Sequence, residues 1–264
     1  MSYKVYKYAI VDDGAEIGDG VEIGPYAIIG PDVKIGEGTI IGPGVIIEKG
    51  VKIGKYCKIS PGVIIGGLPQ DLKYKGEESS VVIGDYNVIR EYVTINRSSK
   101  KNGVTYIGNK NFLMAYVHIA HDCIIGNEVV IANSVGLSGH TVVEDKASLG
   151  GFVGVHQFVR IGKMAMIGGY SKIVQDIPPF MLADGKPAVI YGLNTTGLKR
   201  QGINSEVREE LKKAHRLIYR AHLPLREAIA EIEKLKQFEE IKVLLNFLKA
   251  KSLRGILLKH KRSG

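Results

Sequence analysis

Residues 21–65 read VEIGPYAIIGPDVKIGEGTIIGPGVIIEKGVKIGKYCKISPGVII, a run in which isoleucine recurs at every sixth position from Ile23 to Ile65. The same phase begins at Val11 and continues through aliphatic residues to Ile173, with interruptions near residues 67–82 and 97–106. Neither the 3.6-residue period of a helix nor the two-residue period of a strand produces this pattern. The repeat unit is therefore a hexapeptide.

Each hexapeptide carries two residues suited to a core. A small or β-branched residue stands four positions after each aliphatic residue, as Ala27 and Val33 do. A glycine often follows the aliphatic residue directly, as Gly36 follows Ile35. Two inward side chains and a glycine per six residues describe a short strand and a corner. Such a unit cannot bury its apolar face alone, so copies must stack. We predict a mainly β protein built as a parallel β-solenoid.

The period stops after Ile173, and a different pattern follows. Residues 174–199 contain Pro, Gly and Asn without a period and read as a connector. Helical spacing of apolar residues then predicts helices over 206–223, capped by Ser205, over 224–236, and from 239 past 247. We expect a solenoid domain over 1–190 and a small basic α-helical domain over 191–264.

The formal net charge of +9 belongs to the end of the chain. Residues 199–264 hold 17 Lys and Arg and 8 Asp and Glu, while the rest of the chain is balanced. A basic module suits an acidic protein, a nucleic acid or an anionic lipid, and charge alone does not choose among them.

The sequence carries few signs of secretion or membrane insertion. Cys57 and Cys123 are the only cysteines and do not form a disulfide framework. No run approaches the roughly 20 apolar residues of a membrane span, and residues 1–13 lack the features of a signal peptide. We expect a cytoplasmic protein without a transmembrane segment.

Four of the seven histidines lie between residues 118 and 156. If a coil has eighteen residues, His121, Gly139 and Gln157 form one column with a spacing of about 4.8 Å, and Asp122 and His140 start the next. A neutral imidazole can take a proton from a hydroxyl, with a carboxylate to orient it, and a glycine amide can donate to an oxyanion.

This set of groups predicts acyl transfer from a thioester to a hydroxyl, with His121 as general base. We expect no covalent enzyme intermediate, because no serine or cysteine accompanies the base as an activated nucleophile. Cys123 stands at the small inward position of the repeat, which indicates a core residue.

Several strings carry a family resemblance that spans nearly the whole chain. They are PQDLKY at 69–74, HIAHDC at 118–123, GH at 139–140, VHQF at 155–158, DIPP at 176–179 and GLKR at 197–200. Together they resemble the family of acyl-carrier-protein:UDP-N-acetylglucosamine O-acyltransferases of lipid A biosynthesis. The resemblance implies a left-handed parallel β-helix, a homotrimer, and an enzyme that needs no metal, cofactor or nucleic acid.

The resemblance also implies roles for individual residues. His121, assisted by Asp122, would deprotonate the glucosamine 3-hydroxyl of UDP-N-acetylglucosamine, and the Gly139 amide would hold the oxyanion. The donor would be the (R)-3-hydroxyacyl phosphopantetheine thioester of acyl carrier protein, which the basic C-terminal region suits. The residues expected to bind the substrates are Gln70, Asp71, Lys73, His118, His140, His156, Gln157, Gly169, Asn194 and Arg200.

Three of these residues have particular places in the family. Those matching Asn194 and Arg200 lie near the uridine diphosphate, and the one matching Gly169 lies at the far end of the acyl groove. Counting residues puts Gly169 on the column of His121, at a neighbouring corner two to three coils away. The family's active sites lie between solenoids, so the loop with Gln70 is expected to meet the histidines across a subunit interface.

Two departures and two alternatives stand beside this interpretation. Gln201 and Asn96 replace an arginine and a histidine that many relatives carry.

A γ-type carbonic anhydrase also places histidines on a β-helix, and His118, His121 and His140 would then be zinc ligands. A trimeric scaffold without activity is the other alternative. Asp122 and the Gln-Asp-Leu-Lys-Tyr loop argue against the zinc enzyme, and polar residues aligned on one corner argue against the scaffold.

Overall fold

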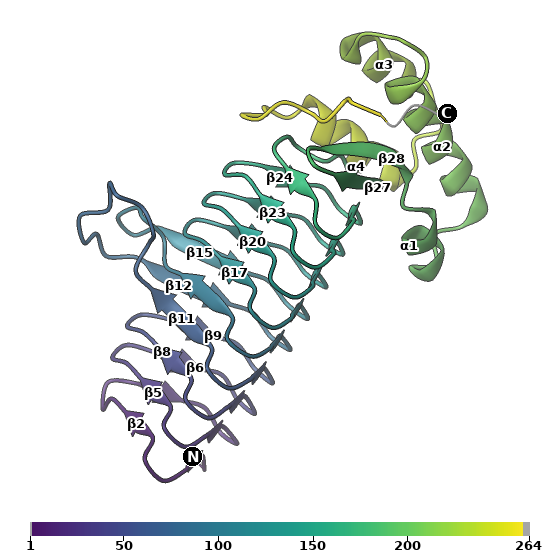
Figure 1. The fold of residues 1–264 in the computed structure, drawn as a ribbon. Coiled ribbons are helices and arrows are strands. Elements are labelled where there is room, and N and C mark those ends of the chain that lie inside the picture. The colour runs from purple at the N-terminus through teal and green to yellow at the C-terminus, as the bar shows by residue number, and fades with distance from the viewer. Residues whose placement is uncertain (1, 261–264) are drawn as a thin grey trace.

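The computed structural model describes residues 2–260 and confirms the fold class, a β-helix followed by a small helical region (Figure 1). Each coil contributes one short strand to each of three sheets, which we call sheets A, B and C in the order in which the chain visits them. Strands of successive coils pair in parallel, with Ile23 beside Ile41 and Ile29 beside Ile47. The eighteen-residue coil is therefore confirmed.

The three sheets run the length of the solenoid. Sheet A contains β1 (Lys4–Val5), β4 (Glu22–Ile23), β7 (Ile40–Ile41), β10 (Lys58–Ile59), β13 (Val88–Ile89), β16 (Phe112–Leu113), β19 (Val130–Ile131), β22 (Ser148–Leu149), β25 (Met166–Ile167), β27 (Met181–Gly185) and β28 (Ala188–Leu193). Sheet B contains β2 (Ile10–Val11), β5 (Ile28–Ile29), β8 (Ile46–Ile47), β11 (Ile64–Gly67), β14 (Thr94–Asn96), β17 (His118–Ile119), β20 (Gly136–Leu137), β23 (Gly154–Val155) and β26 (Lys172–Ile173). Sheet C contains β3 (Glu16–Ile17), β6 (Lys34–Ile35), β9 (Lys52–Ile53), β12 (Ser80–Ile83), β15 (Val104–Ile107), β18 (Ile124–Ile125), β21 (Val142–Val143) and β24 (Arg160–Ile161).

The core is a continuous stack of aliphatic side chains inside the coils. The second residue of each short strand points inward, and so does the residue four positions later, as Ile23 and Ala27 show. Both predicted inward positions are buried through most of the solenoid. Because the hydrophobic effect scales with buried apolar area, each coil is stabilised by its neighbours above and below.

The glycines of the repeat serve two different purposes. Gly36 directly follows an inward isoleucine, and a Cβ there would lie 2.6 Å from the backbone carbon of Gly54 in the next coil. A side chain at that position would therefore push the coils apart. The left-handed backbone conformation falls two residues later, at Gly38, and in other coils that same position is held by residues such as Asp122 and His140.

The two predicted insertions leave the solenoid from adjacent strands. Residues 68–79 connect β11 to β12, and residues 97–103 connect β14 to β15. Since β11 pairs with β14, both insertions project from the edge between sheets B and C on consecutive coils, and the longer one stands out from the solenoid in Figure 1. The core continues past them without a break, because Ile65 pairs with Ile95 and Ile95 with Ile119.

The C-terminal region differs in detail from the prediction. The expected connector contains the antiparallel hairpin β27–β28, which extends sheet A, and the short helix α1 (Thr195–Arg200). The helices α2 (Ser205–Tyr219), α3 (Leu225–Ile232) and α4 (Glu239–Lys249) lie at the C-terminal end of the solenoid in Figure 1. Residue 190, the expected domain boundary, falls within β28. No helix of the described part is long and apolar enough to cross a membrane.

The predicted start of α2 is wrong by one residue and its predicted end by four. Asn204, not Ser205, caps the helix, because its side chain accepts a hydrogen bond from the Val207 N–H at 2.9 Å. At the other end the helix stops at Tyr219, and His222 has the left-handed φ of 54° shortly before Pro224. Helical hydrophobic spacing therefore extends further than the helical backbone does.

A buried ion pair joins the end of the solenoid to the C-terminal region. Arg160 of β24 donates to Asp176 through Nε at 2.7 Å and through its backbone N–H at 2.9 Å, and Asp176 is fully buried. The Arg160 guanidinium also lies 4.2 Å from the centre of the Phe247 ring of α4. The backbone of Asp176 bonds to Gly255 and Leu257, so one residue ties together three segments.

We expect Asp176→Ala to lower the free energy of unfolding by about 3 kcal/mol, because it leaves the Arg160 guanidinium, which is only 18% exposed, and the Arg160 N–H without their partner. Urea denaturation followed by circular dichroism measures this change. Glu16→Ala is the matched control, since its partner Lys34 is exposed and such surface pairs contribute little. Equal, small shifts in both variants would contradict the assignment.

Candidate functional site

A cleft of about 590 Å³ lies on the outer face of sheet B and over the corner that follows this sheet. His118, Gly136, Gly154 and Lys172 form its floor as one column of paired residues. The predicted site residues that line the cleft are Gln70, His118, His121, Gly139, His156 and Gln157. The structure thus brings six of the sequence-predicted residues together within one chain.

The corner after sheet B has the columns that the eighteen-residue count predicts. The backbone N–H of His140 donates to the carbonyl of His121 at 3.1 Å, and that of Phe158 donates to the carbonyl of Gly139 at 3.1 Å. Asp122 and His140 occupy the left-handed position of their corners, with φ of 62° and 60°. Aspartate, asparagine and histidine are enriched among non-glycine residues that adopt this conformation.

His121 and Asp122 form a hydrogen-bonded pair. The Nδ1 atom of His121 lies 2.8 Å from Oδ2 of Asp122. An ionised carboxylate only accepts hydrogen bonds, so Nδ1 carries the proton and Nε2 is left as the basic nitrogen. Nε2 belongs to a ring that lines the cleft, so a substrate hydroxyl there has a base within reach.

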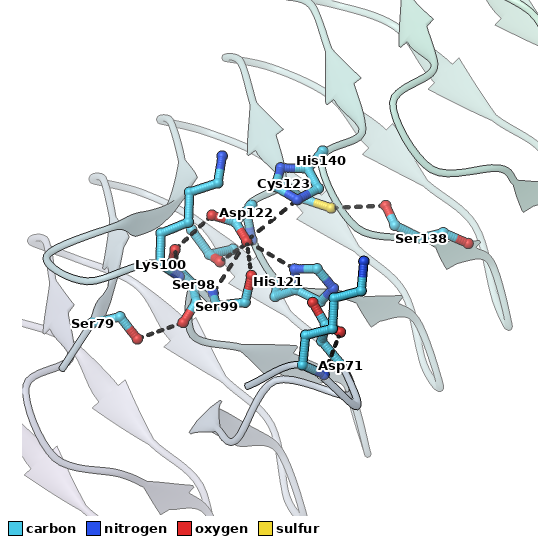
Figure 2. Close-up of polar contacts among 12 residues, drawn as sticks. Asp71, Ser79, Ser98, Ser99, Lys100, His121, Asp122, Cys123, Ser138 and His140 are labelled. Carbon is cyan, nitrogen blue, oxygen red and sulfur yellow. Dashed lines mark hydrogen bonds and ion pairs between the residues drawn. The ribbon is translucent and has the colours of Figure 1, made fainter. Parts of the chain in front are cut away.

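Asp122 is held ionised by the donors around it (Figure 2). Burial opposes its charge, but hydrogen bonds from Ser98, His121 and Ser99 outweigh this effect and hold the pKa of the carboxyl well below its usual range. The Asp122 side chain is only 8% exposed. A buried, ionised carboxylate next to an imidazole favours the imidazolium that forms when the ring takes up a proton.

Gly139 lies directly against the His121 ring. A Cβ on Gly139 would be 2.6 Å from Cε1 and 2.7 Å from Nε2 of His121, so only glycine leaves the ring in place. Among the described residues, no backbone acceptor bonds to the Gly139 N–H. The amide is therefore available to a ligand in the cleft.

The other histidines differ in their surroundings. His118 pairs through Nδ1 with the Thr94 hydroxyl at 2.8 Å, and burial lowers its pKa. Burial also lowers the pKa of His140, whose ring stacks on Phe158 at 4.6 Å and lies 3.7 Å from Asp122. Both rings are therefore neutral at pH 7.

Cys123 is a core residue, as predicted. It is fully buried, and burial raises the pKa of its thiol to about 12. Its Sγ atom lies 3.3 Å from the carbonyl oxygen of Ser138, to which the thiol donates. A protonated and inaccessible thiol is not an acyl acceptor.

The first insertion reaches the cleft from the same chain. Gln70 lines the cleft beside His121, so these two residues do not need a subunit interface to meet, contrary to the expectation. Asp71 accepts a hydrogen bond from the Lys73 N–H at 2.9 Å, which shapes the loop. Asn96 donates to the Leu68 carbonyl at 2.9 Å and anchors the loop at its base.

Three predicted residues lie away from this cleft. Asn194 caps α1 and donates to the Met164 carbonyl at 3.0 Å, and Arg200 is exposed at the end of the same helix. Gly169 follows β25 and therefore lies at the edge between sheets A and B. The prediction that it shares the column of His121 is wrong, because the separation of 48 positions is not a multiple of eighteen.

The histidines of the zinc alternative do not converge. Among residues 2–260, the group with ligand atoms close enough to share a metal ion is His121, Asp122 and His140, within 4.8 Å of one another. His118 is outside this group and is bonded to Thr94. Both oxygens of Asp122 already accept hydrogen bonds from serines. The residues present therefore do not match a three-histidine zinc site.

The sequence analysis missed the polar groups that hold Asp122 and His118 in place. Ser98 and Ser99 bind the Asp122 carboxylate, Thr94 binds His118, and Thr105 accepts a hydrogen bond from the Asp122 N–H at 2.8 Å. The available signal was the interruption at 97–106, since it falls one coil before His121 at the same corner. Lys172, a cation of the cleft, was also missed.

Comparisons with known proteins agree with this geometry. The family model described as "Udp N-acetylglucosamine O-acyltransferase; Domain 2" matches residues 176–257, and the bacterial transferase hexapeptide model matches 14–49, 32–67 and 105–139. A protein of Thiobacillus denitrificans named acyl-[acyl-carrier-protein]–UDP-N-acetylglucosamine O-acyltransferase is 51% identical over 96% of this chain and 98% of its own length. A protein of the same name from Gloeothece citriformis is 53% identical over 68% of this chain, and the matched part of this chain spans 65% of the length of that relative.

Solved structures are similar over almost the whole chain. The UDP-N-acetylglucosamine acyltransferase of Francisella novicida superposes with a TM-score of 0.94 at 39% identity, covering 98% of this chain and 95% of its own. That of Bacteroides fragilis gives a TM-score of 0.92 at 40% identity, covering 94% and 98%. Identity at this level over the full length of a relative, together with the shared solenoid, shows that this chain belongs to the family of acyl-[acyl-carrier-protein]–UDP-N-acetylglucosamine O-acyltransferases.

Proposed function

We propose that the chain transfers a (R)-3-hydroxyacyl group from acyl carrier protein to the glucosamine 3-hydroxyl of UDP-N-acetylglucosamine, the first step of lipid A biosynthesis. The observation that carries this proposal is the hydrogen-bonded pair of His121 and Asp122, 2.8 Å apart, with His121 in one cleft beside Gly139, whose N–H donates to no backbone carbonyl of the described residues. A base with a free nitrogen and an adjacent oxyanion donor are the two groups that direct acyl transfer requires.

In the proposed mechanism, Nε2 of His121 takes the proton of the sugar 3-hydroxyl as that oxygen attacks the thioester carbonyl. A carbon–oxygen bond forms, and the Gly139 N–H donates to the resulting oxyanion. When the intermediate collapses, the carbon–sulfur bond breaks and the imidazolium returns its proton to the leaving thiolate. Asp122 stabilises the imidazolium between these two steps.

We further propose that the working enzyme is a homotrimer. Asn194 and Arg200 lie at the two ends of α1, and Gly169 lies at the edge between sheets A and B. A neighbouring copy that packs against sheet B is able to bring such residues to the cleft. Arg200 is then available to the diphosphate as a charged fork, and the remaining expected contacts, Asp71, Lys73, His140, His156 and Gln157, come from the chain that holds His121.

The basic C-terminal region suits an acidic acyl carrier protein, and complementary charge speeds such encounters.

We place the reaction in the cytoplasm, because Cys57 and Cys123 are both free thiols, as is usual in a reducing compartment. The acyl group arrives on phosphopantetheine, so the proposed chemistry calls on no resident cofactor. Mass spectrometry of products formed from purified acyl carrier protein thioesters tests the function, with 3-hydroxyl and 3-amino sugar nucleotides offered together.

We expect His121→Ala to lower kcat by about 10²–10⁴-fold, because a general base contributes that much. The fold is expected to persist, since the ring lies in the cleft and not in the aliphatic core. Steady-state kinetics at several pH values, with circular dichroism as the folding control, measures the effect. A variant that keeps more than about a tenth of the rate at an unchanged pH optimum would rule out the base.

Gly139→Ala is expected to lower kcat by about a hundredfold, because the added methyl displaces the His121 ring and a misplacement of about 1 Å has an effect of that size. Gly136→Ala is the matched comparison, since Gly136 also lines the cleft but a Cβ there meets nothing within 4 Å. The measurement is kcat for both variants. A loss no larger in Gly139→Ala than in Gly136→Ala would contradict the close fit.

Gly169→Met is expected to shift donor preference toward shorter acyl chains if Gly169 bounds the acyl groove. Each methylene excluded from the groove forfeits about 0.8 kcal/mol of burial. Donors of several lengths competing in one mixture measure the preference, and Gly169→Ala should give a smaller shift in the same direction. An unchanged preference in both variants would place Gly169 outside the groove.

A further inference from the structure

The second insertion packs against the catalytic pair from the coil below. Thr94 of β14 is the register partner of His118 of β17, so residues 97–103 leave the solenoid at the same corner as His121, one coil earlier. This places the hydroxyls of Ser98 and Ser99 and the backbone N–H of Ser99 against the Asp122 carboxylate, as Figure 2 shows.

Both oxygens of the carboxylate are held by this insertion. The Ser98 hydroxyl donates to Oδ1 of Asp122 at 2.5 Å, while the Ser99 hydroxyl and N–H donate to Oδ2 at 2.9 and 3.1 Å. Oδ2 is also the oxygen that accepts from Nδ1 of His121. A carboxylate bound at both oxygens does not rotate, so its direction toward His121 is set by the serines.

That direction matters because two imidazoles share one oxygen. Oδ2 of Asp122 lies 2.8 Å from Nδ1 of His121 and 3.7 Å from Nε2 of His140. A rotation of the carboxylate would weaken the first contact and alter the second. The proton on Nδ1 of His121, and with it the free Nε2, depends on which contact is made.

The Ser98 hydroxyl is itself oriented. It accepts a hydrogen bond from the Lys100 N–H at 3.0 Å, which directs its own proton to Asp122. Gly103 makes room for it, because a Cβ there would collide with the Ser98 hydroxyl.

The insertion is also braced against the first one. The Ser79 hydroxyl donates to the Ser98 carbonyl at 2.5 Å, and the Asn102 N–H donates to the Glu78 carbonyl at 2.7 Å. The first insertion carries Gln70 into the cleft, so the support of the base and the substrate loop are one connected structure.

We propose that Ser98 and Ser99 are positioning residues, which fix the Asp122 carboxylate so that His121 keeps its proton on Nδ1 and presents a free Nε2 to the substrate. The catalytic consequence rests on the proposed function, whereas the tautomer does not. Neither serine is among the residues that line the cleft, so they act through Asp122.

The double variant Ser98→Ala, Ser99→Ala tests the proposal with two readouts. We expect kcat to fall by about tenfold to a hundredfold, by analogy with hydrogen-bond partners that orient metal-bound imidazoles, while both KM values stay unchanged. We also expect ¹⁵N NMR of histidine-labelled protein to show the His121 ring losing its single Nδ1–H tautomer. Ser99→Thr keeps the hydroxyl at the partly exposed serine and should keep most of the rate that Ser99→Ala loses.

Lys101→Ala is the matched control on the same insertion, because Lys101 is exposed and its change should leave kcat and the tautomer as they are. If the double variant does not fold, the two single alanine variants carry the same test. An unchanged kcat with an unchanged tautomer overturns the proposal, and so does a rise in KM alone. If the wild type transfers no acyl group, the proposed function fails, while the NMR comparison still decides the role of the serines.

Discussion

Stacking of coils is the constraint on which the rest of this structure depends. A hexapeptide buries its two inward side chains only when another coil lies above and below, so successive coils must keep one register. The pairing of Ile29 with Ile47, and of Ile119 with Leu137, shows this register both before and after the two insertions. Residues eighteen positions apart consequently become direct neighbours, which turns a sequence interval into a spatial column.

The same constraint explains where chemistry is found. Most inward positions are apolar, the exceptions being small buried residues such as Thr39 and Asn87, and glycines keep the coils close. Charged and titratable groups are therefore free to vary mainly on outer faces and at corners. The corner after sheet B uses that freedom on several consecutive coils. It carries Gln70 on one insertion, Ser98 and Ser99 on the next, and then His121 and Gly139. A rigid scaffold thus supports side chains whose mutual distances are set by the coil spacing.

Electrostatics at this corner depends on burial combined with hydrogen bonding. Asp122 is removed from water, which by itself would favour its neutral form, yet serine donors and His121 keep it charged. His118 bonds to a neutral hydroxyl and His140 lies 3.7 Å from the Asp122 carboxylate, beyond hydrogen-bond distance, and burial leaves both rings neutral. Among these three histidines, only His121 has a hydrogen-bonded carboxylate, so only the pair of His121 and Asp122 has the arrangement of a base and its support.

The sequence by itself determined the solenoid, the coil length and the column of His121, Gly139 and Gln157, because a strict period translates directly into register. It also identified Cys123 as core. Only the tertiary structure decided which groups hold Asp122, since Ser98 and Ser99 reach it through an insertion that follows no period. The end of α2, the hairpin β27–β28 and the edge on which Gly169 lies were likewise decided there. Packing and local hydrogen bonds set these features, and neither leaves a periodic signal in the chain.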